Sequence, residues 1–433
     1  MDTAITIGII LLITYFGLIY FAARGGNLMV GFFVMAVIWI ALCMVGGQLS
    51  WQDAQANILQ GGPESWGATA VNVIFGSWFG RILIETGIAS KLIKSVTELG
   101  GDNPLFTTIL LSIVSGIIFT STFGAGAVVA IGVIILPILM SLGVPKPLAV
   151  TSYLMSVGSG MYINQVLFKQ MQGIFEDMLY DANYFKFGFA AMAVQLILVG
   201  AMLIINLRKK KTRKKAWAAK AGKPTNIEAT VPTIAMITPI IPTALAIIFK
   251  WQSIPAFIVG SVFGLAVCGK LPNFGQACRT ISRTFYDGVV DVASLLGFLF
   301  ILPMFNKISG IAAPFFEAIL GGVMPESTLV LCIVFAIVAP FGLFRGPLTI
   351  FGAGAATVGV LNAIGGFSTP FLFTLMYVPT ISMNLSACPT QSWNLWALNY
   401  SKVSVKEFMK TGIVWAWLIV IINITLVFLM FGR

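Results

Sequence analysis

Two stretches of this chain share one pentapeptide: FTSTFGAGAVVAIG (Phe119–Gly132) and RGPLTIFGAGAATVG (Arg345–Gly359). The two FGAGA copies begin 228 residues apart, and the same offset aligns Thr151–Asn164 with Pro379–Ser392. Each copy interrupts a long apolar run with glycines, which let the backbone turn, and each lies beside Ser, Thr or Arg. A repeat of this kind indicates two related halves.

The composition places the chain in a membrane. Of its 433 residues, 58% are hydrophobic and 9% are charged, and the mean hydropathy is +0.96. A soluble domain carries about 25% charged residues, so we expect an all-α polytopic membrane protein. The net charge of +11 would suggest nucleic acid in a soluble protein, but basic residues also mark cytoplasmic loops, and we expect no nucleic-acid partner.

Missing residue types exclude several kinds of chemistry. The chain has no histidine, which removes imidazole bases, His-zinc sites and histidine proton relays. Its five cysteines form no CxxC pair and are expected to be small buried hydrophobes. No nucleophile–base set and no Walker A loop occur, so neither an enzyme nor an ATP-driven pump is expected.

Apolar runs bounded by charges and Gly/Pro clusters predict the membrane segments. Two runs are too long for one crossing and are broken by FGAGA, so we expect re-entrant helical hairpins at about 105–141 and 327–362. The other ten segments are expected near 4–22, 28–47, 67–96, 148–168, 184–206, 231–249, 253–269, 285–306, 369–400 and 411–431.

A basic linker, 207–230, divides the chain into repeat 1 (1–206) and repeat 2 (231–433). Each half is expected to hold five transmembrane helices and one re-entrant hairpin, and an odd number of crossings makes the two repeats inverted in topology. The positive-inside rule puts residues 207–223 in the cytoplasm and both termini outside. We expect a cell membrane location, plasma or inner membrane, where the linker can also contact anionic lipid headgroups.

Inverted repeats of secondary transporters form the substrate site near the midplane, where interrupted helices meet. The first hairpin tip offers Ser121, Thr122 and Gly124 as substrate ligands. The alternative for this tip is close helix packing by small residues.

The second tip offers Arg345, Gly346 and Thr349. An arginine inside an apolar run is costly and usually functional, and it can hold a carboxylate through two hydrogen bonds. The alternative is a structural ion pair of Arg345 with Asp291 or Glu85.

Two further segments place polar residues at lipid depth: SVGSGMYINQ (Ser156–Gln165) and SMNLSACPTQS (Ser382–Ser392). Broken helices that line a site explain both segments. Their candidate substrate ligands are Ser159, Asn164, Asn384, Ser386 and Thr390. The alternative is hydrogen bonding between helices, worth about 0.6–2 kcal/mol for each residue.

Carboxylates and hydroxyls are the candidates for ion coupling. Without histidine, Glu85 and Asp291 are the expected proton carriers, whereas Ser121 and Thr122 suit Na⁺. Arg81 lies four residues before Glu85, so an ion pair between them on one helix face is expected. No cofactor is expected beyond H⁺ or Na⁺ as the coupling ion.

Three stretches resemble the ion transporter superfamily, and within it the gluconate permease family: FGSWFGRILIETGIASKLI (Phe75–Ile93), FRGPLTIFGAGAATVGVLNA (Phe344–Ala363) and QSWNLWALNYSKVSVKEFMKTGIVW (Gln391–Trp415). Members of that family usually carry a glutamate in the first hairpin, where this chain reads TSTFGAGAV. The resemblance implies a homodimer, a mobile hairpin domain that moves like an elevator, and hydroxyl-based sodium sites as an alternative to proton coupling.

Together these features predict a secondary active transporter of a small organic anion, such as a sugar acid or carboxylate, coupled to H⁺ or Na⁺. An ion channel, or a transporter of a neutral or cationic solute on the same fold, is the alternative. Two unlike hairpins in one chain count against a channel, which usually has a repeated pore filter.

Overall fold

Helix is the one type of regular secondary structure in the part of the chain that the structure describes. The computed structural model describes residues 3–24, 26–101, 103–175, 177–209, 231–320, 327–344, 346–352, 354–364 and 366–432. Within these ranges no β-strand occurs, which confirms the all-α prediction. Residues 210–230 of the expected linker lie outside them.

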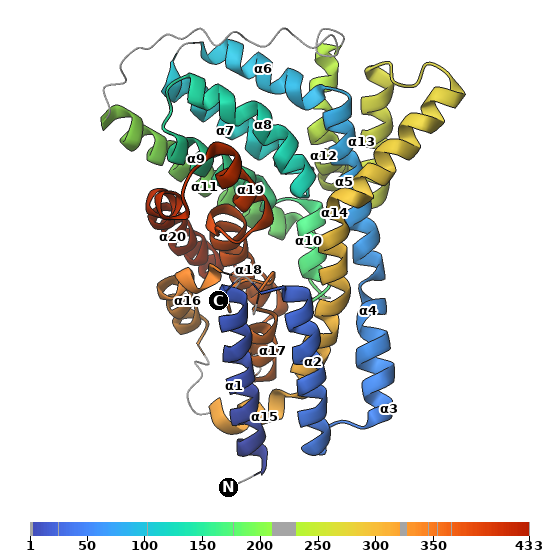
Figure 1. Cartoon of the computed structure of the whole chain (residues 1–433), viewed down its shortest axis with the longest axis vertical. Helices are drawn as coiled ribbons and strands as arrows, with labels where there is room; N and C mark the ends of the chain where they lie inside the picture. The colour runs from blue at the N-terminus through green and yellow to red at the C-terminus, as the bar shows by residue number, and fades with distance from the viewer. Residues whose placement is uncertain are drawn as a thin grey trace.

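The first half of the chain, drawn from blue to green in Figure 1, contains the helices up to residue 209. They are α1 (Thr3–Ala23), α2 (Leu28–Val45), α3 (Trp51–Asp53), the π-helical η1 (Ala54–Gln60), α4 (Gly61–Ser65), α5 (Gly67–Glu85), α6 (Ile88–Gly100), α7 (Pro104–Phe119), α8 (Ala125–Ser141), α9 (Lys146–Met161), α10 (Gln165–Gln172) and α11 (Ala182–Lys209).

The helices after residue 231 form the second half of the chain. Its elements are the 3₁₀-helix η3 (Thr233–Ile240), α12 (Ile241–Phe249), α13 (Ser253–Val267), α14 (Phe274–Ile311), α15 (Ala313–Leu320), α16 (Thr328–Ile337), the 3₁₀-helix η4 (Ala339–Gly342), α17 (Gly354–Ile364), α18 (Thr369–Pro379), the π-helical η5 (Thr380–Leu385), α19 (Ser392–Ser401) and α20 (Val405–Phe431).

The chain is a multi-pass membrane protein by the length and apolarity of its helices. Five described helical stretches are long and apolar enough to cross a bilayer: Thr3–Phe21, Trp51–Glu85, Ala182–Leu207, Phe274–Ile311 and Val405–Phe431. Shorter apolar helices accompany them, among them both helices of the first expected hairpin.

The expected segment 67–96 was wrong at both ends. Helix begins at Trp51, where the Ser50 hydroxyl accepts a hydrogen bond from the Asp53 amide at 3.1 Å, and runs to Glu85. The chain then breaks at Gly87, whose φ of 79° lies in the left-handed region. Hydropathy identified only the apolar part of this helix, because residues 51–66 are polar and amphipathic.

The expected segment 285–306 was too short for the same reason. Helix α14 begins after Asn273, whose side chain accepts from the Gln276 amide at 2.9 Å, and continues unbroken for 38 residues. Its first turns are rich in polar and basic residues, so the apolar pattern starts later than the helix.

Both FGAGA copies interrupt helical pairs, as expected. In the first pair, residues 120–124 separate α7 from α8, and in the second a long irregular stretch follows η4 and precedes α17. Each copy straddles the start of the second helix, at Ala125 and at Gly354. Apolar helices that stop inside the protein leave free backbone N–H and C=O groups at both breaks.

The two halves are packed into each other. Helices α5 and α14 lie side by side, α2 packs on α14, and α13 packs on α5. Figure 1 shows α6, α7 and α8 in the upper part of the molecule and α15 and α17 in the lower part, with α14 running between the two levels. The segments most deeply buried are α9 and α18 with η5.

Candidate functional site

A cavity of about 510 Å³ lies where the interrupted segments of both halves meet. Its walls come from the α1–α2 connection at Gly26 and Asn27, the first tip at Phe123–Ala125, α14 between Asp291 and Phe298, the second tip at Phe351, and the η5–α19 connection at Leu385 and Thr390–Trp393. Both FGAGA copies therefore reach one cavity, although they are far apart in sequence.

The first tip is held by the break between α9 and α10. The Asn164 amide donates to the carbonyls of Phe119 at 2.8 Å and Thr122 at 3.1 Å, while its oxygen accepts from the Leu167 amide at 3.0 Å. One buried side chain thus binds a carbonyl at the end of α7 and one in the tip, and it also caps α10. Gly124, at the cavity wall, has a φ of 108°, which only glycine adopts without strain.

The second tip is held in a similar way by the break between η5 and α19. The Ile350 amide donates to the Thr380 hydroxyl at 3.2 Å, and the Phe344 amide donates to the Cys388 sulfur at 3.1 Å. Cys388 also lies 3.0 Å from the hydroxyl of Thr390, which reaches the cavity. Each tip therefore rests on the broken helix of its own half.

Among the described residues, four aromatic side chains line the cavity: Phe123, Phe298, Phe351 and Trp393. Phe123 and Trp393 meet edge to face with ring centroids 6.1 Å apart, and the Trp393 indole donates to the Leu385 carbonyl at 3.2 Å. Phe298 and Phe351 add two further rings. The aromatic rings offer a solute apolar contact. The side chains that can orient it through hydrogen bonds are those of Asn27, Ser294, Thr390, Gln391 and Ser392.

Asp291 is the one charged side chain among the described residues that line the cavity. Its carboxylate binds the Arg81 guanidinium at 2.7 Å, and the two side chains are 15% and 24% exposed. A Cβ at Gly126 would overlap this carboxylate, so the acid lies against the first turn of α8. Asp291 thus connects α14, α5, the first hairpin and the cavity.

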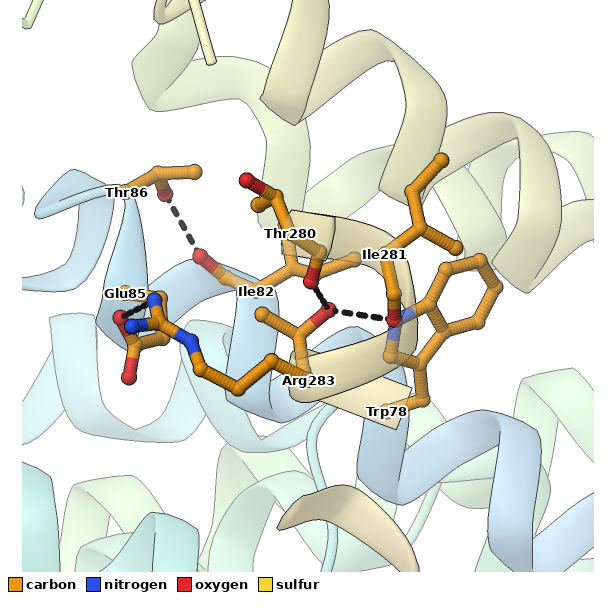
Figure 2. Close-up of polar contacts among 8 residues, drawn as sticks. Trp78, Ile82, Glu85, Thr86, Thr280, Ile281 and Arg283 are labelled. Carbon is orange, nitrogen blue, oxygen red and sulfur yellow. Dashed lines mark hydrogen bonds and ion pairs between the residues drawn. The ribbon is translucent and has the colours of Figure 1, made fainter. Parts of the chain in front are cut away.

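The expected pair between Arg81 and Glu85 was wrong. Glu85 instead binds Arg283 at 2.9 Å, at the exposed end of the α5–α14 contact. Figure 2 shows the Arg283 side chain reaching from α14 to Glu85, while the Trp78 indole, on the other side of the view, donates to Thr284 at 3.1 Å. Because α5 and α14 lie side by side, Arg81 and Glu85 each find an oppositely charged partner on α14. These pairs replace the expected pair between residues one turn apart on α5.

The remaining hydroxyl candidates are buried away from the cavity walls. Ser121 lies 2.9 Å from the Thr243 hydroxyl, and Ser159 donates to the Ser156 carbonyl one turn earlier. Thr122 is fully buried, and its hydroxyl has no hydrogen-bond partner among the described residues.

The candidates of the second half are buried too. Thr349 and Asn384 are fully buried with side-chain polar atoms that lack a partner in the described part of the chain, and Gly346 is packed under the Phe341 carbonyl. Ser386 donates to the Ile381 carbonyl at 2.8 Å. Arg345 lies outside the described residues.

A polar network behind the cavity joins the two halves. Gln195 on α11 donates to Ser386 at 3.1 Å, and Asn423 on α20 donates to the Tyr162 hydroxyl at 2.9 Å. Gln195 and Asn423 are separated by the same 228 residues as the FGAGA copies. So are Gly158 and Ser386, which touch so closely that a Cβ at Gly158 would overlap the Ser386 hydroxyl.

Sequence reasoning missed the aromatic residues of the site. Trp393 and Phe298 were unremarkable in a chain with 10 tryptophans and 34 phenylalanines. The signal that could have identified Trp393 is its place directly after CPTQS, a polar stretch that interrupts a membrane segment. Phe298 carried no such signal, since it lies within a continuous apolar helix.

Comparison with known proteins identifies a shared fold. No protein-family model matches the sequence, and no curated protein matches it significantly. The fold is similar to the crystal structure of the YdaH transporter of Alcanivorax borkumensis, which is described as having an unusual topology. The TM-score is 0.61 at 15% sequence identity, over 92% of this chain and 96% of that one. The chain therefore has a fold that a membrane transporter also uses.

Proposed function

We propose that the protein is a secondary active transporter. The observation that carries this proposal is the cavity itself, where two interrupted helical pairs and a broken helix from both halves of one chain converge. Such convergence at the interface of two repeats is typical of secondary transporters. The shared fold with the YdaH transporter supports the same conclusion.

The proposal includes two inverted repeats and alternating access. Corresponding pairs of helices make corresponding contacts, since α2 packs on α14 as α13 packs on α5, and the two hairpins lie at different levels in Figure 1. Gly158 and Ser386, equivalent by the 228-residue offset, touch each other. Equivalent positions meet in this way beside a pseudo-twofold axis, which supports the repeat.

The proposed substrate is a small organic anion, such as a sugar acid or carboxylate. Arg345 precedes the second tip in the sequence, and its guanidinium suits a carboxylate. The resemblance to the gluconate permease family supports this class, and with it an elevator movement, a homodimer and a cell-membrane location with the basic linker in the cytoplasm.

Asp291 is the proposed coupling residue. It is a carboxylate at the cavity wall, paired with Arg81 and lying against the mobile first hairpin, so a change in its charge alters contacts on three helices at once. Coupling to H⁺ requires protonation of this carboxylate, whereas coupling to Na⁺ would use its oxygens or the Ser121 and Thr122 hydroxyls as ligands.

Uptake into proteoliposomes tests the proposal. Radiolabelled sugar acids and carboxylates are supplied under imposed pH or Na⁺ gradients, and we expect accumulation that collapses with the gradient. Arg345→Ala should weaken substrate binding, and Asp291→Asn should leave exchange without gradient-driven accumulation. The anion proposal fails if no such solute accumulates and Arg345→Ala binds as the unmodified protein does.

A neutral or cationic solute is the second candidate. The observation in its favour is that Asp291 is the one charge among the described lining residues, and it is negative. The same proteoliposomes, supplied with amines and polyols, separate the two candidates.

A further inference from the structure

A second cavity, of about 310 Å³, lies apart from the first. It is lined by Ser65 and Trp66 at the junction of α4 and α5, by α14 between Pro303 and Gly310, and by Val358, Gly359 and Asn362 on α17. It shares no lining residue with the first cavity.

The second cavity lies further along α14 toward the level of α15 and α17 in Figure 1. Sixteen residues separate Asp291 from Lys307, a rise of about 24 Å at 1.5 Å for each residue. Between the two lining stretches, Leu299 and Leu302 are buried, with Leu302 completely enclosed. The two cavities are therefore two separate spaces along one long helix.

The polar groups of the second cavity are suited to an anion. Lys307 is exposed there, and it takes part in neither of the two ion pairs found among the described residues. None of the described residues that line this cavity is acidic. The Lys307 ammonium group lies beside the turn into α4, where a Cβ at Gly61 would be in ordinary contact with the nitrogen at 3.7 Å.

The neighbouring side-chain amide of Asn306 indicates that the ligand must also supply a hydrogen-bond donor. The Asn306 side-chain oxygen is buried and has no hydrogen-bond partner among the described residues. A buried acceptor without a partner costs about 1–3 kcal/mol, so a ligand that brings a hydroxyl or N–H donor would relieve it. Asn362 lies across the cavity on α17.

We infer that this second cavity binds small hydroxycarboxylates and is a vestibule for the substrate, separate from the first cavity, at the level of α15 and α17. Lys307 holds the carboxylate, and Asn306 accepts a hydrogen bond from a hydroxyl group. The inference rests on the proposed function for its transport role, because α17 belongs to the second hairpin and forms one wall of the vestibule.

A thiol-protection experiment tests it without any transport. Asn362→Cys is introduced as a reporter into purified protein in which the partly exposed Cys268 and exposed Cys278 are replaced by Ser. Labelling by a neutral maleimide is timed with and without sodium gluconate, with sorbitol as the uncharged polyol and sodium chloride as the salt control. We expect gluconate alone to slow labelling at least threefold.

Matched lysine variants assign the effect. Lys307→Gln should abolish the protection, Lys307→Arg should retain it, and Lys186→Gln should leave it unchanged, since Lys186 is an exposed lysine on α11 away from this cavity. Equal protection by gluconate in Lys307→Gln, or no protection in the parent, overturns the inference. If Lys307→Gln does not fold, Asn306→Leu and Lys307→Arg replace it in the test. Loss of protection in Asn306→Leu together with retained protection in Lys307→Arg supports the inference, and any other result overturns it.

Transport measurements keep the two proposals distinct. If gluconate protects the reporter thiol but is not taken up, the second cavity binds anions and the proposed transport function is wrong. Uptake of gluconate without protection would retain the function while this inference fails. If both stand, Lys307→Gln should raise KM about fivefold from one side of oriented proteoliposomes with kcat unchanged, the pattern of lost uniform binding.

Discussion

Replacing Asp291 by Asn keeps the size of the side chain and removes its charge, which isolates what the Arg81–Asp291 pair contributes to stability. The pair is short, at 2.7 Å, and mostly buried. The guanidinium left behind would keep its charge with little access to water, and its Nε already lacks a partner within the described residues. Breaking a buried ion pair costs about 3–5 kcal/mol, and we expect about 3 kcal/mol here because both groups retain some exposure.

The same two helices supply the matched control. Glu85 and Arg283 form the other ion pair between α5 and α14, at 2.9 Å, but their side chains are 33% and 63% exposed. An exposed pair of this kind contributes about 0–1 kcal/mol, so Glu85→Gln should cost little. The contrast depends on burial alone, since both variants turn a carboxylate into an amide at the same helix interface.

Thermal unfolding in detergent, followed by tryptophan fluorescence, measures the difference. Asp291→Asn should unfold well below the parent and Glu85→Gln close to it. Adding Arg81→Gln to Asp291→Asn should recover most of the loss, because no uncompensated charge then remains buried. Equal unfolding temperatures for Asp291→Asn and Glu85→Gln, or a double variant less stable than Asp291→Asn, would refute this reasoning.

Three further changes follow from the packing, and unfolding in detergent checks each of them. Asn164→Ala removes three hydrogen bonds that join the first tip to α10 and should lower the free energy of unfolding by about 3 kcal/mol. Its control, Asn206→Ala, loses one bond within its own helix and should cost under about 1 kcal/mol. Equal losses of stability in the two variants would contradict the role of Asn164. Gly158→Ala should destabilise the protein by about 1–3 kcal/mol, because the new methyl group would overlap the broken helix of the other half. Gly200→Ala is the control and should not destabilise it, since a Cβ at Gly200 would meet no atom within 4 Å. Unchanged stability of Gly158→Ala would rule out the close contact. Ser404→Ala breaks the capping box of α20 and should cost about 1 kcal/mol, and no measurable change would argue against that cap.

Much of the architecture was predictable because apolar length and glycine breaks are local properties. The apolar runs predicted the helices, and the FGAGA copies predicted where helical pairs are interrupted. The limits of the 67–96 and 285–306 segments were wrong because helix continues through polar turns that hydropathy does not register. The polar residues at each break could also be predicted, because they are close to the break in the sequence.

The sequence by itself determined that this is an all-helical membrane protein with two interrupted helical pairs, because composition and spacing suffice for that. Only the tertiary structure decided which polar residues meet. Asp291 and Thr390 reach one cavity with the first tip, whereas Asn164 is used to hold that tip and Arg81 turns from Glu85 to Asp291. Such pairings depend on how α5, α14 and the two tips pack across the halves, and residues some 200 positions apart carry no local signal of that contact.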